Sequence, residues 1–261
     1  MSSESIIVAG VVDPDRAQEI GNNGEQRDFF EAHKEILPFI IIPRIKLLNP
    51  YDTRQIESCC EILNDEETML HLAGSKQTPE KLLQRIKEPR TFVFVAENYL
   101  GEPVGTVTSI DPVPLSLTTT NLTAAAVRAD MKGKGIGTQM HAYVLDLLYH
   151  DPKMNPVYSR EEGEIPVVRM NIIGGVKKDG LNEPDLPMEI VYKRLGFRAY
   201  DFDIFHLRDI STQERIEALK RGEVIFEPAV MYRITRNQWP KGTGVKIAQA
   251  TLVRKFPRFF S

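Results

Sequence analysis

Three glycines within five residues, at positions 133, 135 and 137, constrain the fold of this chain more than any other feature. A β-branched run, 115–127, precedes them and predicts a strand. An amphipathic run, 136–149, follows and predicts a helix. Such a loop lets a ligand approach the backbone, because glycine has no side chain to stand in the way. The helix then begins with free N–H groups and about half a unit of positive charge. The stretch therefore predicts a phosphate-binding loop.

The spacing of the glycines differs from that of two common phosphate-binding loops. The P-loop has four residues between its glycines, followed by Lys and then Ser or Thr. The dinucleotide-binding fingerprint reads G-x-G-x-x-G. Here the pattern is G-x-G-x-G, and the strand before it is rich in Thr and Ala. Neither of those two nucleotide sites is predicted.

The segment from Val127 to Thr138 resembles the acetyl-CoA-binding motif of the GCN5-related N-acetyltransferases, the GNAT superfamily. That motif has a Val, a few residues, and then Arg/Gln-x-x-Gly-x-Gly/Ala. Lys132 stands where Arg or Gln is usual, so a basic residue is retained. A second segment, from Tyr192 to Phe197, is similar to the family's Tyr-x-x-x-Gly-Phe at the end of a helix. The two motifs occur in the family's order, and the resemblance covers about residues 41–235.

The resemblance implies a mixed α/β fold. Its central, mostly antiparallel sheet is splayed between the fourth and fifth strands and is flanked by helices. Periodicity alone gives the order β, α, α, β, β, β, α up to the glycine loop, which agrees with this fold. We expect an N-terminal extension over 1–40, an acetyltransferase domain over 41–235 and a C-terminal extension over 236–261.

Acetyl-CoA is the implied cosubstrate, and no metal is expected. Backbone N–H groups of the loop would bind its pyrophosphate, and the pantetheine arm would pair with the end of the strand at Val127. The strand expected at 167–173 would lie on the other side of the arm. The implied cofactor-binding residues are Val127, Ala129, Lys132, Gly133, Lys134, Gly135, Ile136, Gly137 and Thr138.

The resemblance also implies one catalytic residue. Tyr192 occupies the position of the tyrosine that protonates the departing thiolate in many members, and the alternative is a packed tyrosine. Where the histone-acetylating branch has a glutamate base, this chain has Asn121, which cannot accept a proton. A neutral amine nucleophile still requires a base or a water chain. Acidic residues in the polar loops are candidates, although each is more typical of a solvated surface; they are Glu161, Glu162, Glu164, Glu183 and Asp185.

The predicted function is therefore acetyl-CoA-dependent N-acetyl transfer to a primary amine on a small molecule or a protein. The formal net charge of −3 gives no reason to expect nucleic acid or an anionic membrane as partner. No segment approaches the roughly 20 apolar residues of a membrane span, so we expect a cytoplasmic protein, with a homodimer as one possible assembly. The alternative is a non-catalytic CoA-binding or interaction module, in which the terminal extensions carry the function.

Local patterns predict the remaining elements. Asp52 with Gln55 has capping-box spacing, and Thr78 precedes a proline at the start of a second helix. Cys59 and Cys60 lie on the apolar face of the first helix, which favours buried, inert thiols. Strands are expected over 41–48, 91–96, 104–110, 167–173, 198–207 and 224–234, and further helices over 25–39, 188–195 and 212–221.

The five histidines are scattered, and each is interpreted as a surface or packing residue. The basic, aromatic tail, 235–261, fits either a docking segment or, as we favour, a helix or strand that packs on the domain.

Overall fold

The structure is a computed structural model of the whole chain. It describes residues 34–41, 44–66, 68, 76–89, 91–110, 119–151, 167–173, 187–206 and 226–259. Among these residues, no helix combines the length and apolar character that a membrane crossing requires.

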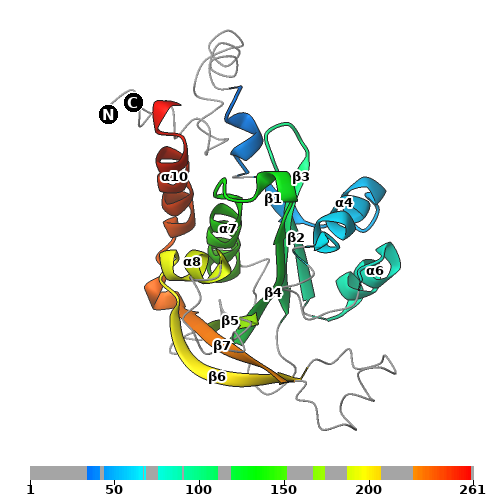
Figure 1. Cartoon of the computed structure of the whole chain (residues 1–261), viewed down its shortest axis with the longest axis vertical. Helices are drawn as coiled ribbons and strands as arrows, with labels where there is room; N and C mark the ends of the chain where they lie inside the picture. Colours follow the sequence, from blue (N-terminus) through cyan, green and yellow to red (C-terminus); the bar gives the residue numbers. More distant parts are fainter. Residues whose placement is uncertain are drawn as a thin grey trace.

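The described elements include both helices and strands, in a mixed order along the chain (Figure 1). The strands are β1 (Ile45–Leu47), β2 (Thr91–Glu97), β3 (Pro103–Ile110), β4 (Thr119–Val127), β5 (Val167–Ile173), β6 (Arg198–His206) and β7 (Phe226–Thr235). The α-helices are α4 (Thr53–Leu63), α6 (Pro79–Lys87), α7 (Ile136–His150), α8 (Pro187–Arg194) and α10 (Thr243–Lys255). Short 3-10 helices are η1 (Leu37–Phe39), η2 (Ala129–Met131), η3 (Arg236–Gln238) and η4 (Pro257–Phe259).

The strands form one seven-stranded sheet in the order β1-β2-β3-β4-β5-β7-β6. Neighbouring strands are antiparallel except for β4 and β5, which are parallel. Helices α4 and α6 cover one face of this sheet, and α7, α8 and α10 lie on the other (Figure 1). The predicted α+β fold, with a mostly antiparallel sheet flanked by helices, is confirmed.

The two predicted helix starts are also confirmed. Asp52 caps α4 by accepting a hydrogen bond from the backbone N–H of Gln55, at 3.1 Å. The Gln55 side chain does not accept from the N–H of Asp52 in return: its oxygen accepts from the N–H of Asn49, and its amide nitrogen donates to Glu97 on β2. The capping box is therefore only half formed. Thr78 caps α6 through the N–H of Lys81. These caps fix where both helices begin on their face of the sheet.

The two cysteines of α4 are free and buried, as expected. Cys59 packs in a cluster with residues of α6 and β2. Its burial raises the pKa of the Cys59 thiol to about 12, so the thiolate is scarce at neutral pH. These thiols therefore serve packing.

Segments on both flanks of the expected domain contribute to its core. Ile36 and Ile40, beside η1, are fully buried in the same cluster as α7. From the other end, Trp239 and Leu252 are buried there too. The tail thus forms a helix packed on the domain, which is the reading favoured from sequence. The boundaries at 40 and 235 remain predictions, but side chains from both sides of each boundary share one core.

Some expectations differ from the structure or lie outside it. The first strand, expected over 41–48, is limited to Ile45–Leu47. Most of the helix expected over 25–39, the helix over 212–221 and the first residues of the strand at 115–127 lie outside the described residues.

Candidate functional site

The glycine loop connects β4 to α7 through the short helix η2. Gly133 and Gly135 have φ angles of 75° and 90°, in the left-handed region that favours glycine. Gly135 is the N-cap of α7, and no side chain caps the helix there. The N–H groups of Gly135, Ile136, Gly137 and Thr138 lie in the first turn, where an α-helix provides no partner. The loop thus presents a row of backbone donors at the positive end of the helix dipole.

Gly137 differs from the other two glycines, because its backbone does not require glycine. It lies inside α7 with ordinary helical backbone, and a Cβ built on it would lie 3.7 Å from Val127 Cγ2. This is an ordinary van der Waals contact, so an alanine would fit. The geometry agrees with the Gly/Ala choice at this position of the motif.

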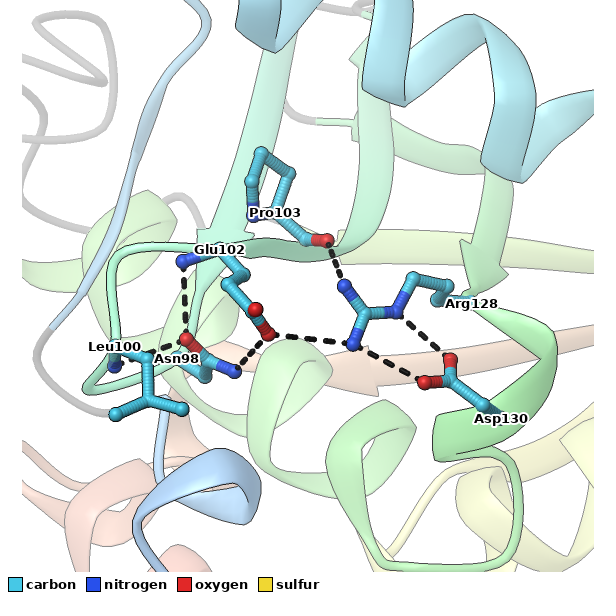
Figure 2. A network of polar contacts seen from close by, with 6 residues as sticks. All are labelled: Asn98, Leu100, Glu102, Pro103, Arg128 and Asp130. Carbon is cyan, nitrogen blue, oxygen red and sulfur yellow. Dashed lines mark hydrogen bonds and ion pairs between the residues drawn. The ribbon is translucent and has the colours of Figure 1, made fainter.

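Arg128 fixes the start of the loop through a polar network with the turn between β2 and β3 (Figure 2). Its guanidinium forms two hydrogen bonds with Asp130, at 2.7 and 3.1 Å, and reaches Glu102 at 3.4 Å. Glu102 in turn accepts from the amide of Asn98. The N–H of Arg128 also donates to Val104 on β3. A planar, forked guanidinium suits such a bidentate contact, so the loop leaves β4 in a defined direction.

The two lysines of the loop have different surroundings. Lys132 forms an ion pair with Asp65 at 2.7 Å, and this contact lowers the pKa of the Asp65 carboxyl. The positive charge of Lys132 is therefore already partly balanced. Lys134 lies over the ring of Phe39, with its ammonium 5.7 Å from the ring centroid. Of the two, Lys134 leaves more charge for an anionic ligand.

Helix α10 flanks the loop. A Cβ built on Gly135 would lie 2.6 Å from Thr251 Cγ2 and 3.6 Å from Lys255 Cγ, so the last turns of α10 are in contact with the loop backbone. Phe256, which follows α10, stacks on Phe39 at a centroid distance of 5.0 Å. Residues 39 and 251–256, far apart in sequence, thus meet beside the start of α7.

Pairing between β4 and β5 stops partway along both strands. It runs from Thr119↔Val167 to Leu122↔Met170, whereas β4 continues to Val127 and β5 to Ile173. On its other side, β4 pairs with β3 across a register shift that leaves one extra residue in β4, a bulge between Thr123 and Ala126. We call the region where β4 (123–127) and β5 (171–173) continue without pairing with each other the β4/β5 fork. It opens at the end of β4 that carries the glycine loop.

The second sequence motif forms the end of α8. Gly196 has a φ of 81°; its N–H donates to Lys193 O, and the N–H of Phe197 donates to Tyr192 O. These two bonds make a Schellman motif, in which residues C3 and C″ also touch. That contact is between the rings of Tyr192 and Phe197, whose centroids are 5.6 Å apart. The Tyr-x-x-x-Gly-Phe pattern therefore fixes where the tyrosine ring lies.

Tyr192 is buried among aromatic rings. Tyr232 of β7 lies at 5.7 Å and His141 of α7, edge-on, at 5.9 Å between ring centroids. Only 4% of Tyr192 is exposed. Burial, with a smaller contribution from Tyr232, raises the pKa of the Tyr192 phenol, so the hydroxyl keeps its proton at neutral pH.

The predicted residues thus fall into two groups joined by α7. The loop residues gather at its N-terminus, where Gly137 faces Val127. Tyr192 lies one turn further along, beside His141. The five acidic residues considered as bases lie outside the described residues, and the side chain of Asn121 is not described.

Three residues that contact the loop or Tyr192 were not predicted as part of the site: Arg128, His141 and Thr251. Only Arg128 gave a usable signal, because an Arg two residues before an Asp at the end of a strand can form a local ion pair. Thr251 and His141 depend on contacts between distant segments.

Comparison with known proteins agrees with this geometry. The sequence model of the acetyltransferase (GNAT) family matches residues 56–159, from within α4 to beyond the end of α7. No curated protein sequence matches the chain.

Two solved structures share the fold. Spermidine N-acetyltransferase from Vibrio cholerae, in complex with CoA and spermine, is 11% identical with a TM-score of 0.51, covering 75% of this chain and 96% of that chain. RimJ from Mycobacterium smegmatis, in complex with CoA-disulfide, is 14% identical with a TM-score of 0.52, covering 79% of this chain and 87% of that chain.

The forked sheet, the glycine loop and the helix that follows it together have the α+β acetyltransferase fold. Over residues 56–159 the chain is similar to the acetyltransferase (GNAT) family.

Proposed function

We propose that the chain is an acetyl-CoA-dependent N-acetyltransferase that transfers the acetyl group directly from the thioester to a primary amine. One observation carries the proposal: the β4/β5 fork opens at the same end of β4 that leads into the uncapped N-terminus of α7. A phosphate cradle and an unpaired strand edge are therefore continuous. That combination suits a ligand with a pyrophosphate at one end and an amide-bearing arm at the other.

The glycine loop supplies the anion-binding part of the acetyl-CoA site. The N–H groups from Gly133 to Thr138 bind the pyrophosphate, and the helix dipole favours its negative charge. Lys134 adds a cation beside the loop, and Lys132 contributes less because Asp65 already pairs with it. Ala129 and Ile136 place the backbone on either side of the cradle: Ala129 begins η2, and Ile136, the first residue of α7, is fully buried.

The unpaired stretch of β4 that ends at Val127 holds the pantetheine arm. Its main chain offers N–H and C=O groups that β5 does not use, so the arm adds to the strand as an extra edge. An N–H of this stretch also polarises the thioester carbonyl, because a fixed backbone donor stabilises the charge that develops on that oxygen.

Tyr192 protonates the departing thiolate. Its raised pKa keeps the phenol protonated at neutral pH, so a proton is present when the thiolate departs. The amine must lose a proton before it attacks, and Asn121 cannot take it. A water chain or a carboxylate from the loops at 152–166 or 174–186 serves as base.

Binding and turnover are measured separately to test the proposal. Calorimetry with CoA should give a single site, and Gly137→Leu should abolish it while Gly137→Ala keeps it, because only the larger side chain covers the first-turn N–H groups. Both variants are checked for an intact fold by circular dichroism.

A panel of primary amines, including a polyamine, an aminoglycoside and a peptide with a free N-terminus, is then screened for release of free thiol from acetyl-CoA. Wild type that binds no CoA would refute the proposal.

The second candidate is a CoA-binding module without turnover. The burial of Tyr192 favours it, since a tyrosine ring packed against three other aromatic rings serves the core equally well. Firm CoA binding with no thiol release for any amine would select this candidate.

A further inference from the structure

His141 of α7 carries a buried ring nitrogen that has no hydrogen-bond partner within the described part of the chain. Its Nδ1 lies 2.7 Å from the carbonyl oxygen of Gly137. A carbonyl oxygen only accepts hydrogen bonds, so Nδ1 carries the proton and Nε2 is left with a bare lone pair. The helix itself thereby selects the tautomer of His141.

Nε2 finds no donor among the described residues. The side chain is 0% exposed, so bulk water cannot supply one. Leaving a buried acceptor unpaired costs about 1–3 kcal/mol, and native proteins keep such groups for a reason that lies outside packing. A ligand that donates a hydrogen bond on binding would remove this cost.

The position of His141 on α7 brings this acceptor close to the β4/β5 fork. Residues four apart lie on the same face of a helix, and Gly137, one turn earlier, faces Val127 at the end of β4. Strand β4 leads up to the glycine loop and α7 leads away from it, so the two run side by side in opposite directions (Figure 1). The residues one turn into α7 therefore lie beside the part of β4 just before Val127. This part of β4 does not pair with β5. Tyr192 packs against the same imidazole.

A role as general base is excluded by the chemistry of the ring. Burial lowers the pKa of His141 to about 4, which makes it a far weaker base than an amine of pKa about 10.4. The neutral ring can still accept a hydrogen bond. Positioning, and not proton transfer, is what this side chain can provide.

We propose that Nε2 of His141 accepts a hydrogen bond from an amide N–H of the arm that occupies the β4/β5 fork, and so holds the arm beside Tyr192. The inference rests on the proposed function, because it takes the arm to be pantetheine. It makes His141 a positioning residue and assigns it to the part of the site that binds acetyl-CoA.

Nitrogen NMR of the histidine ring tests this contact directly. In free protein labelled with ¹⁵N-histidine, Nε2 of His141 should resonate in the range of an unprotonated ring nitrogen, and saturating CoA should move it upfield as it gains a donor. The resonance is assigned as the one missing from His141→Gln. Adenosine 3′-phosphate 5′-diphosphate is the matched control ligand, because it carries the phosphates of CoA and no amide. It should bind and leave Nε2 unmoved.

Two variants give a second readout by calorimetry. His141→Phe keeps an aromatic ring beside Tyr192 and removes the acceptor, so CoA affinity should fall about 3- to 10-fold, the worth of one neutral hydrogen bond. Affinity for the control nucleotide should not change. His141→Gln places an amide oxygen near the position of Nε2 and should restore most of the CoA affinity.

The outcomes separate the two proposals. Wild type that binds CoA without moving Nε2, or a shift that the control nucleotide also produces, would overturn the role of His141 and leave the proposed function standing. Wild type that binds no CoA would overturn both. If His141→Phe does not fold, the NMR measurement on wild type decides alone.

Discussion

Thr251 of α10 lies directly against Gly135, the N-cap of α7. The methyl carbon Cγ2 of Thr251 is 2.6 Å from where a Cβ on Gly135 would be, a distance at which one of the two groups must move. The hydroxyl of Thr251 donates to Ile247 O within α10 and holds the side chain in place. The loop that we assign to phosphate binding is therefore shaped partly by a helix outside the segment that matches the family.

Gly135→Ala should destabilise the protein by two effects that can be separated. The positive φ costs about 1–2 kcal/mol for an alanine, and the overlap with Thr251 adds about 1–3 kcal/mol. Gly101→Ala is the matched control: it has a φ of 77° and no atom within 4 Å, so it should show the first cost alone. Urea unfolding of both variants measures the difference.

A double-mutant cycle then assigns the second cost. Thr251→Ser removes Cγ2 and keeps the hydroxyl, so it should recover most of the overlap cost in the Gly135→Ala background. Strictly additive free energies of unfolding would show that Thr251 does not limit the space at Gly135.

A protein reduced to residues 41–235 should fail to fold. It would lack Trp239, which is 1% exposed and donates to Asp146 of α7 at 2.8 Å, and it would lack α10. Loss of a buried Trp alone costs about 3–5 kcal/mol, a large part of the stability of an ordinary domain. The comparison is with residues 34–259, by soluble yield and circular dichroism. A soluble, cooperatively unfolding 41–235 fragment that binds CoA would show that both extensions are appendages.

Tyr192→Phe should separate an enzyme from a binding module. The change removes one hydroxyl and keeps the ring contacts, so turnover with a working amine should fall about 10²–10⁴-fold while CoA affinity stays near that of wild type. Tyr149→Phe makes the same chemical change elsewhere in the core, where the hydroxyl donates to Ile234 O. That control should lose about 1–2 kcal/mol of stability and little activity. Equal turnover of Tyr192→Phe and wild type would remove the catalytic assignment.

Stability should fall on acidification because of His141. Its pKa is about 4 in the folded protein and 6.5 when unperturbed, so between these values the unfolded chain binds the proton and the folded one does not. Stability is therefore complete above pH 6.5 and declines as the pH drops towards 4, by on the order of 3 kcal/mol in total. Urea unfolding of wild type and His141→Gln at pH 7 and pH 5 measures this. The variant should lose less stability over that interval, and an equal loss in both would exclude His141 as the source.

The local elements of the site could be predicted from sequence because their causes are local. The glycines at 133 and 135 are required by backbone angles within the loop itself, and the Tyr-x-x-x-Gly-Phe pattern contains every residue of the turn that it forms. Asp52 caps α4 three residues from its partner. In each case the interacting groups lie within one or two helical turns of the chain.

The contacts that surround these elements could not be predicted. They are made between residues far apart in the chain, and no repeating pattern in the sequence indicates them. Trp239 and Asp146 are 93 residues apart, and nothing near either position indicates the other. Periodicity places His141 on a helix but does not indicate Tyr192 as its neighbour, so the sequence supports only a surface or packing role for it. The sequence does not indicate that Asp65 balances the charge of Lys132, because the two residues are 67 positions apart.

The place of Trp239 and α10 in the core has a consequence for biosynthesis. Domains generally fold as units while the chain emerges from the ribosome, N-terminal parts first. Here the burial of helix α7 cannot be completed until residues about a hundred positions later, up to Leu252, have left the exit tunnel. The last strand of the sheet, which ends at Thr235, is therefore translated before the domain can close. During that interval the nascent chain exposes the surface of α7 that α10 will bury, and this is where a ribosome-associated chaperone would bind.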